Sequence, residues 1–289
     1  MNLFNIIEEI EKVDPELTDR INPRRDAIKN LTSFGSKVAV AALPFALGSL
    51  FQKAYAGTST SSVVDVLNYA LTLEYLESYF YNQGTAAPGL IPSADSAYIA
   101  DITDDENHHV TFLKSVIKSL GGTPVSSPEF DLTAGNGSGK GPFADVLTNY
   151  QTFLAVAETF EDTGVRAYKA EANKLLGNQV VLTAALSIHA VEARHASAIR
   201  QLRRNKYGAT VKPWINSTLS LGNDTGIALV NANYDGENNV VQGGIDITTL
   251  PGAALGSKTS VQTATAAFDE PLIMQQVLAI LVGSFIVKK

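Results

Sequence analysis

Four stretches of the chain after Gly57 place apolar residues at alternating steps of four and three positions, the pattern of a helix with one buried face. The stripes run over residues 63–81, 99–120, 147–168 and 181–202. Each stripe is apolar along its length except near its middle. The sequence therefore predicts four amphipathic helices that bury a common core.

The middle of every stripe carries glutamate, and two of the stripes carry histidine as well. The stripe positions concerned are Glu74, Glu77, Glu106, His109, Glu161, Glu192 and His195. A carboxylate that faces a protein core is costly to desolvate unless a positive charge lies beside it. A polar layer at the same height in four helices therefore predicts a shared cation site inside the bundle.

Two of the stripes contain a Glu-x-x-His pair, formed by Glu106 with His109 and by Glu192 with His195. Residues three apart share a helix face, so both members of a pair can point at one centre. The other two stripes place a glutamate 32 and 31 residues before these pairs. The spacing predicts two similar helical hairpins.

One glutamate from each of two helices, with Glu-x-x-His from each of the other two, is the ligand set of ferritin-like di-iron and di-manganese bundles. The chain resembles the exported ferritin-like domain proteins of bacteria, which are similar to plant desiccation-related proteins. The motifs that carry the resemblance are residues 73–77, 105–109, 160–165 and 192–195, with 267–272 in the tail. It covers about residues 60–205 and extends weakly to the end of the chain.

The resemblance implies an all-α, ferritin-like four-helix bundle with two metal ions in its core. Carboxylate and imidazole ligands favour iron or manganese, with zinc as a substitute. The expected metal ligands are Glu74, Glu106, His109, Glu161, Glu192 and His195. Glu77 lies one turn after Glu74, and its counterpart in the third helix is Gly164. We interpret Glu77 as an extra ligand or as a catalytic acid that delivers protons.

Two functions fit this ligand set. The first is an exported di-iron or di-manganese protein with ferroxidase, oxidase or peroxide-consuming activity, in which the metals react with dioxygen or peroxide. The alternative is a non-catalytic stress- or desiccation-related protein with a structural or vestigial metal site. Without metal, the histidines and glutamates would instead satisfy each other, and Glu74 or Glu161 would reach solvent or pair with an arginine such as Arg166 or Arg194.

Several neighbouring polar residues are expected to support the site. We expect Glu158 to support a ligand or to face solvent, and His108 and His189 to lie on the helix surface or to orient a ligand. Tyr81 and Tyr168 are expected in the core, where a hydroxyl can bond a ligand carboxylate.

The four predicted helices and the segments that connect them make up one predicted domain, residues 57–205. Residues 121–142 are rich in Gly, Ser and Pro, which fits the single long crossover between helices two and three of ferritin-like folds. Residues 206–289 form a mostly irregular extension that we expect to pack on the bundle, with residues 207–268 over one end of it. It is predicted to contain a small hairpin that turns at residues 234–236, and a last short helix from Asp269 to about residue 285. An extension of this length argues against a hollow storage cage.

The N-terminal residues resemble a twin-arginine export signal, which we assign to residues 1–56. Arg24 and Arg25 precede an apolar run over residues 38–51, and residues 54–56 offer a small-x-small cleavage pattern. The run has 14 residues, short of the about 20 that a spanning helix needs. We expect a periplasmic or extracellular protein without a stable membrane span in its mature part. A retained, membrane-associated N-terminal helix is the alternative.

The amino-acid composition excludes several kinds of site and partner. The 289 residues include no cysteine, which excludes disulfides, thiolate zinc sites, iron–sulfur clusters and cysteine nucleophiles. The formal net charge of −7 offers no basic surface for phosphates, so we expect no nucleic-acid partner. An oligomer is compatible with the sequence.

Overall fold

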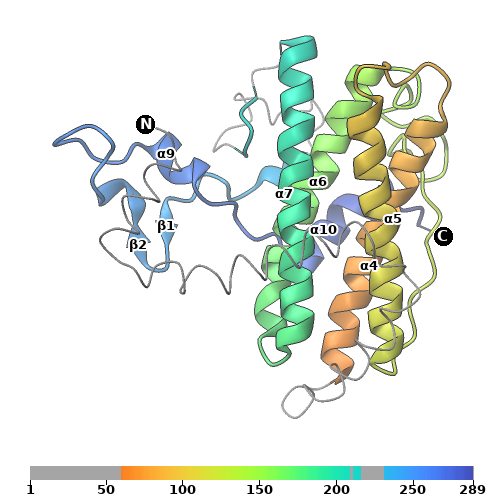
Figure 1. Ribbon diagram of the computed structural model, residues 1–289, viewed down its shortest axis with the longest axis horizontal. Coiled ribbons are helices and arrows are strands. Elements are labelled where there is room, and N and C mark those ends of the chain that lie inside the picture. Colours follow the sequence, from red (N-terminus) through yellow and green to blue (C-terminus); the bar gives the residue numbers. More distant parts are fainter. Residues whose placement is uncertain (1–59, 209–210, 216–230, 289) are drawn as a thin grey trace, which may run out of the picture. The chain divides into compact units, whose positions relative to one another are not determined.

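The computed structural model describes residues 60–208, 211–215 and 231–288, which belong to one compact unit of the chain. The predicted export signal, residues 1–56, lies outside the described residues. The described chain is mostly helical, and four long helices dominate it (Figure 1). They are α4 (Thr60–Ala86), α5 (Ser96–Ser119), α6 (Tyr150–Ala172) and α7 (Gln179–Tyr207).

The four helices form two hairpins. Helix α4 packs chiefly on α5 and α6 on α7, and further contacts join α4 to α6 (Figure 1). Helices α6 and α7 begin at Asn149 and Asn178, whose side chains accept hydrogen bonds from backbone N–H groups of the first turn. Helix α7 ends at Gly208 in the left-handed conformation. The all-α bundle predicted from the sequence is confirmed.

An aromatic cluster holds α4 against α6. The rings of Phe80 and Phe153 stack with centroids 4.5 Å apart, and Phe160 meets Phe80 edge-on at 5.2 Å. Gly84 permits this approach, because a Cβ atom there would lie 2.3 Å from the Phe153 ring. Truncating one of these buried rings to alanine is expected to cost about 3–5 kcal/mol of unfolding free energy.

The connection between α5 and α6 is the long crossover that the sequence predicts. The carboxylate of Asp131 organises it by accepting hydrogen bonds from the backbone N–H groups of Thr133, Gly137 and Gly139. The Asp131 N–H donates in turn to the Phe285 carbonyl, at 2.8 Å. The crossover is therefore tied to the C-terminal end of the chain.

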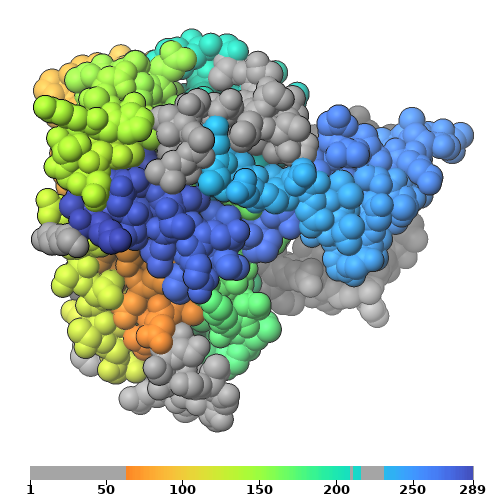
Figure 2. Space-filling view, turned by 180° about the vertical axis from the view of Figure 1, so that it is seen from behind, coloured from red at the N-terminus to blue at the C-terminus, as the bar shows by residue number. Residues whose placement is uncertain are grey.

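The C-terminal extension consists of short elements. They are η3 (Ala232–Tyr234), β1 (Val241–Gln242), β2 (Ile245–Asp246), η4 (Ile247–Thr249), α9 (Val261–Ala266) and α10 (Met274–Leu281). Helix α10 packs on α6, and the C-terminal residues appear dark blue in Figure 2. The Phe285 ring meets Phe160 at 4.8 Å, and the Leu272 N–H donates to the Arg166 carbonyl. This segment thus lies along the side of α6.

The extension differs from the expected one in three places. The small antiparallel hairpin turns at Gly243 and Gly244, both with positive φ, and not at residues 234–236. Helix α9 lies in a part of the extension that was expected to be irregular. Helix α10 begins at Met274 and not after Asp269, because the residues before it bond to other segments: Lys169 donates to the Asp269 carbonyl, and the Glu270 N–H donates to Glu237.

Buried charges fasten the extension to α6 and α7. The Arg166 guanidinium lies 2.9 Å from Glu237, and both side chains are almost fully buried. Asp162 accepts hydrogen bonds from Arg200 of α7 and from the Tyr234 hydroxyl. These contacts explain why the middle of α6 is buried on all sides, including the side that faces away from the other three helices.

None of the helices in the described ranges is long and apolar enough to cross a membrane.

Candidate metal centre

The six side chains expected as metal ligands lie together in the middle of the bundle. They come from all four helices: Glu74 from α4, Glu106 and His109 from α5, Glu161 from α6, and Glu192 and His195 from α7. The four glutamates are fully buried, and the histidines are 8% and 6% exposed. Both histidines therefore point into the bundle, as a metal site requires.

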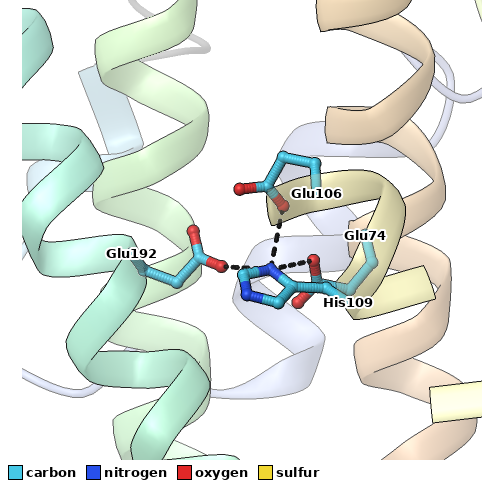
Figure 3. Close-up of side chains that lie close together, drawn as sticks. All are labelled: Glu74, Glu106, His109 and Glu192. Atoms are coloured by element: carbon cyan, nitrogen blue, oxygen red, sulfur yellow. Dashed lines mark hydrogen bonds and ion pairs between the residues drawn. The ribbon is translucent and has the colours of Figure 1, made fainter. Parts of the chain in front are cut away.

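The first half of the centre surrounds His109 (Figure 3). Its Nδ1 atom lies 3.1 Å from Glu74 Oε2, 3.1 Å from Glu106 Oε2 and 3.4 Å from Glu192 Oε1. One ligand atom from each of these four residues lies within 4.8 Å of all the others. Three helices thus converge on one point.

The second half surrounds His195 in a similar way. Its Nδ1 atom lies 2.9 Å from Glu106 Oε1 and 3.3 Å from Glu161 Oε2. With Glu192 these residues form a second group whose ligand atoms lie within 4.8 Å of one another. Glu106 and Glu192 belong to both groups, which is the arrangement of two carboxylates shared between neighbouring cations.

Buried polar atoms in the centre are left without hydrogen-bond partners. Among the described residues these atoms are Glu106 Oε1, Glu161 Oε2, both carboxylate oxygens of Glu192, and His195 Nδ1. Several lie near each other without the geometry of a hydrogen bond. Unsatisfied buried carboxylate oxygens are costly. Atoms that converge in this way fit ligation of metal ions.

The electrostatics of the centre favour the same conclusion. Burial raises the pKa of Glu106 to about 7, and burial together with the Glu106 carboxylate raises the pKa of Glu192 well above its usual range. Burial would lower the pKa of His109 and of His195, but the surrounding carboxylates raise both far above the usual value. The centre without metal must therefore hold extra protons. Two divalent cations would balance four carboxylates with both imidazoles neutral.

A family model described as ferritin-like domain matches residues 62–205 of the chain. The chain contains a ferritin-like domain. The match spans all four helices that supply the centre. No curated protein matches the sequence.

Glu77 of the ferritin-like domain is buried close to the centre but belongs to neither four-residue group. Burial, followed by the charges of Glu192 and Glu106, raises its pKa well above the usual value. Its counterpart Gly164 packs tightly against the centre, because a Cβ atom there would lie 3.0 Å from Glu192 Oε2 and would push that carboxylate aside. The two halves of the centre therefore differ on this side.

Two tyrosines support the outer carboxylates. The Tyr168 hydroxyl of α6 donates to Glu74 Oε1 of α4, and the Tyr81 hydroxyl of α4 donates to Glu161 Oε1 of α6. Each tyrosine thus holds a glutamate of the other hairpin. The expectation that these hydroxyls bond candidate ligand carboxylates is confirmed.

Asp105 contacts the site, although it was not among the expected ligands or supporting residues. Its Oδ2 atom lies 3.1 Å from His195 Nε2, and its side chain is 52% exposed. A carboxylate on the second ring nitrogen fixes the orientation of a ligating histidine and leaves the other nitrogen free for the metal. Asp105 lies off the apolar stripe, so helical periodicity assigns it to solvent. The position before Glu192 in the second pair is Val191, which offers no such bond.

The remaining candidates lie away from the centre. Glu158 is 1% exposed and pairs with Arg203 at 2.6 Å, so the expectation of a solvent-facing side chain was wrong. Helix α7 places this arginine beside it, a contact that the spacing in α6 alone does not reveal. His108 is exposed and His189 is half-buried on α7. Arg166 pairs with Glu237.

Proposed function

We propose that the ferritin-like domain binds two iron or two manganese ions and reacts with dioxygen or peroxide as an exported di-metal carboxylate protein. The observation that supports this most directly is the pair of ligand groups that share Glu106 and Glu192. Their unpartnered oxygens point to two neighbouring cations and not to one.

Each outer pair of residues would hold one ion. Glu74 and His109 would hold the first, Glu161 and His195 the second, and Glu106 and Glu192 would contribute to both. When bound, two ferrous ions supply the two electrons that convert dioxygen and two protons to hydrogen peroxide, or peroxide and two protons to water.

The residues around the ligands would position them and move protons. The Tyr81 and Tyr168 hydroxyls orient the outer glutamates, and Asp105 orients His195. Glu77 is buried, the charges of Glu192 and Glu106 help to raise its pKa, and it belongs to neither ligand group. We assign to Glu77 the transfer of protons to the oxidant, because it is a buried carboxyl group near the centre that is not among the six candidate ligands.

A non-catalytic protein with a structural metal is the second candidate. The burial of all six candidate ligands favours it, because a centre closed to solvent suits a metal that only holds helices together. Stress or desiccation protection would be the corresponding role.

The test combines metal analysis with rapid kinetics. Protein purified without added metal is analysed for bound iron, manganese and zinc, and the iron form is then mixed with oxygen or peroxide in a stopped-flow spectrometer. We expect about two metals per chain in the parent. His109→Ala and His195→Ala should each lose metal and rapid oxidation. His108→Ala removes an exposed neighbouring imidazole and is the matched control.

The outcomes separate the two candidates. Rapid oxidation in the parent and in the His108 variant, with loss in the other two, supports the catalytic role. A parent that holds two metals but reacts with neither oxidant contradicts it and favours the structural role. In that case, loss of metal should lower the melting temperature sharply.

A further inference from the structure

A small pocket lies beside the metal centre, between α4, α6 and α7. Its lining includes Leu67, Tyr69, Ala70, Leu73, Tyr168 and Ala185. The cavity has a volume of about 20 Å³, which is roughly the room for one water-sized molecule. Its surface is almost wholly apolar.

A single side chain, that of Tyr168, lies between the pocket and the candidate ligand Glu74. Tyr168 lines it, and the hydroxyl of the same residue donates a hydrogen bond to Glu74 Oε1. Leu73 also lines the pocket and directly precedes Glu74 in α4. A molecule in the pocket would therefore be separated from the first half of the centre by the Tyr168 ring and the α4 backbone.

The few polar groups of the pocket offer too few hydrogen bonds to hold a water molecule. Glu171 is in the lining, but its carboxylate is bonded to Lys174 at 2.7 and 2.8 Å. The Tyr69 hydroxyl is buried and has no hydrogen-bond partner among the described residues. An ordered buried water makes about three hydrogen bonds, whereas apolar cavities stay dry and accept gases such as xenon. One hydroxyl does not provide the bonds that water or hydrogen peroxide needs.

We propose that this pocket binds dioxygen, a small apolar molecule, and supplies it to the metal centre. The inference rests on the proposed function and names its oxidant as dioxygen and not peroxide. It also assigns a role to Tyr69, whose single hydroxyl can donate one bond to a bound diatomic molecule.

The first test needs no turnover. Crystals of the parent protein are pressurised with xenon, and density is expected between Tyr69, Leu73 and Tyr168. Ala185→Leu fills the pocket and should remove that density. Ala184→Leu adds the same side chain one position away, outside the pocket lining, and should retain it. Ala70→Val is a smaller change for the case in which the leucine variant does not fold.

The second test compares oxidants in the iron-loaded protein. Ala185→Leu should raise the oxygen concentration for half-maximal oxidation by at least about tenfold, because it adds three carbon atoms and a single methylene in an apolar pocket already has an effect of about 10- to 200-fold. Its rate with peroxide, and both rates of Ala184→Leu, should match the parent.

Three results overturn the inference: ordered water in the pocket, no xenon in it, or equal oxygen dependence in the two leucine variants. A parent that reacts with peroxide but not with oxygen also overturns it while leaving the proposed function intact. A parent that reacts with neither oxidant contradicts the proposed function. Xenon binding then still decides whether the pocket takes an apolar gas.

Discussion

Glu106 of α5 and Glu192 of α7 each offer an oxygen to both four-residue groups of the centre, so these two glutamates join its halves. The other four candidate ligands each serve one half only. The two classes of residue should therefore respond differently to substitution.

Replacing a shared glutamate should disturb both metals. Glu192→Gln keeps the shape of the side chain but removes the one negative charge that both halves share, so metal content should fall from about two per chain to below one. Glu74→Gln should lose one metal and keep the other. Titration calorimetry and elemental analysis measure both effects. Equal stoichiometry in the two variants would contradict the bridging role of Glu192.

The hydrogen bond that the Nε2–H group of His195 donates to Asp105 should strengthen the second half of the centre. Asp105→Asn should weaken metal binding there by about 10- to 100-fold, the usual effect of removing a residue that orients a ligand. Asp104→Asn changes an exposed neighbour and is the control. If both variants bind metal alike in calorimetry, the Asp105 contact has no role in the site.

Glu237 should make stability depend on pH. Burial, opposed by Arg166, raises its pKa to about 7. Between the unfolded pKa of about 4.3 and this value, the folded chain holds a proton that the unfolded chain has released. The free energy of unfolding should therefore fall as pH rises across this interval, by up to about 1.4 kcal/mol per pH unit.

Denaturant unfolding of the metal-loaded protein at a series of pH values measures this slope. The candidate histidines take up protons when the chain unfolds and releases the metal, so the contribution of Glu237 is measured as the difference in slope between the parent and Glu237→Gln. Glu237→Gln should lack the downward contribution of Glu237, whereas Asp101→Asn on the exposed surface of α5 should keep the slope of the parent. A parent-like slope in Glu237→Gln would mean that another group carries the effect.

Export should depend on the paired arginines near the N-terminus. If the twin-arginine machinery recognises Arg24 and Arg25, replacing both by lysine should leave the full-length chain in the cytoplasm, although the charge is unchanged. Fractionation locates the protein, and N-terminal sequencing shows whether the parent begins near Gly57. A parent that keeps Met1, or a lysine variant that is exported normally, would contradict the assignment of this segment.

The sequence by itself determined the four helices and the polar layer in their middle. Apolar periodicity is a local property, and residues three apart must share a helix face, so Glu106 and His109 could be paired from spacing alone. The cost of desolvating the glutamates of the four stripes then predicted a shared cation. These arguments need no knowledge of how the hairpins pack.

The tertiary structure decided which side chains meet between helices and where the extension lies. Asp105 reaches His195 across 90 positions of sequence, and Tyr168 reaches Glu74 across 94. Helix α10 starts later than its sequence suggests, because the residues before it bond to α6 and to Glu237. Such contacts depend on the rotation and offset of whole elements, and local periodicity carries no information about either.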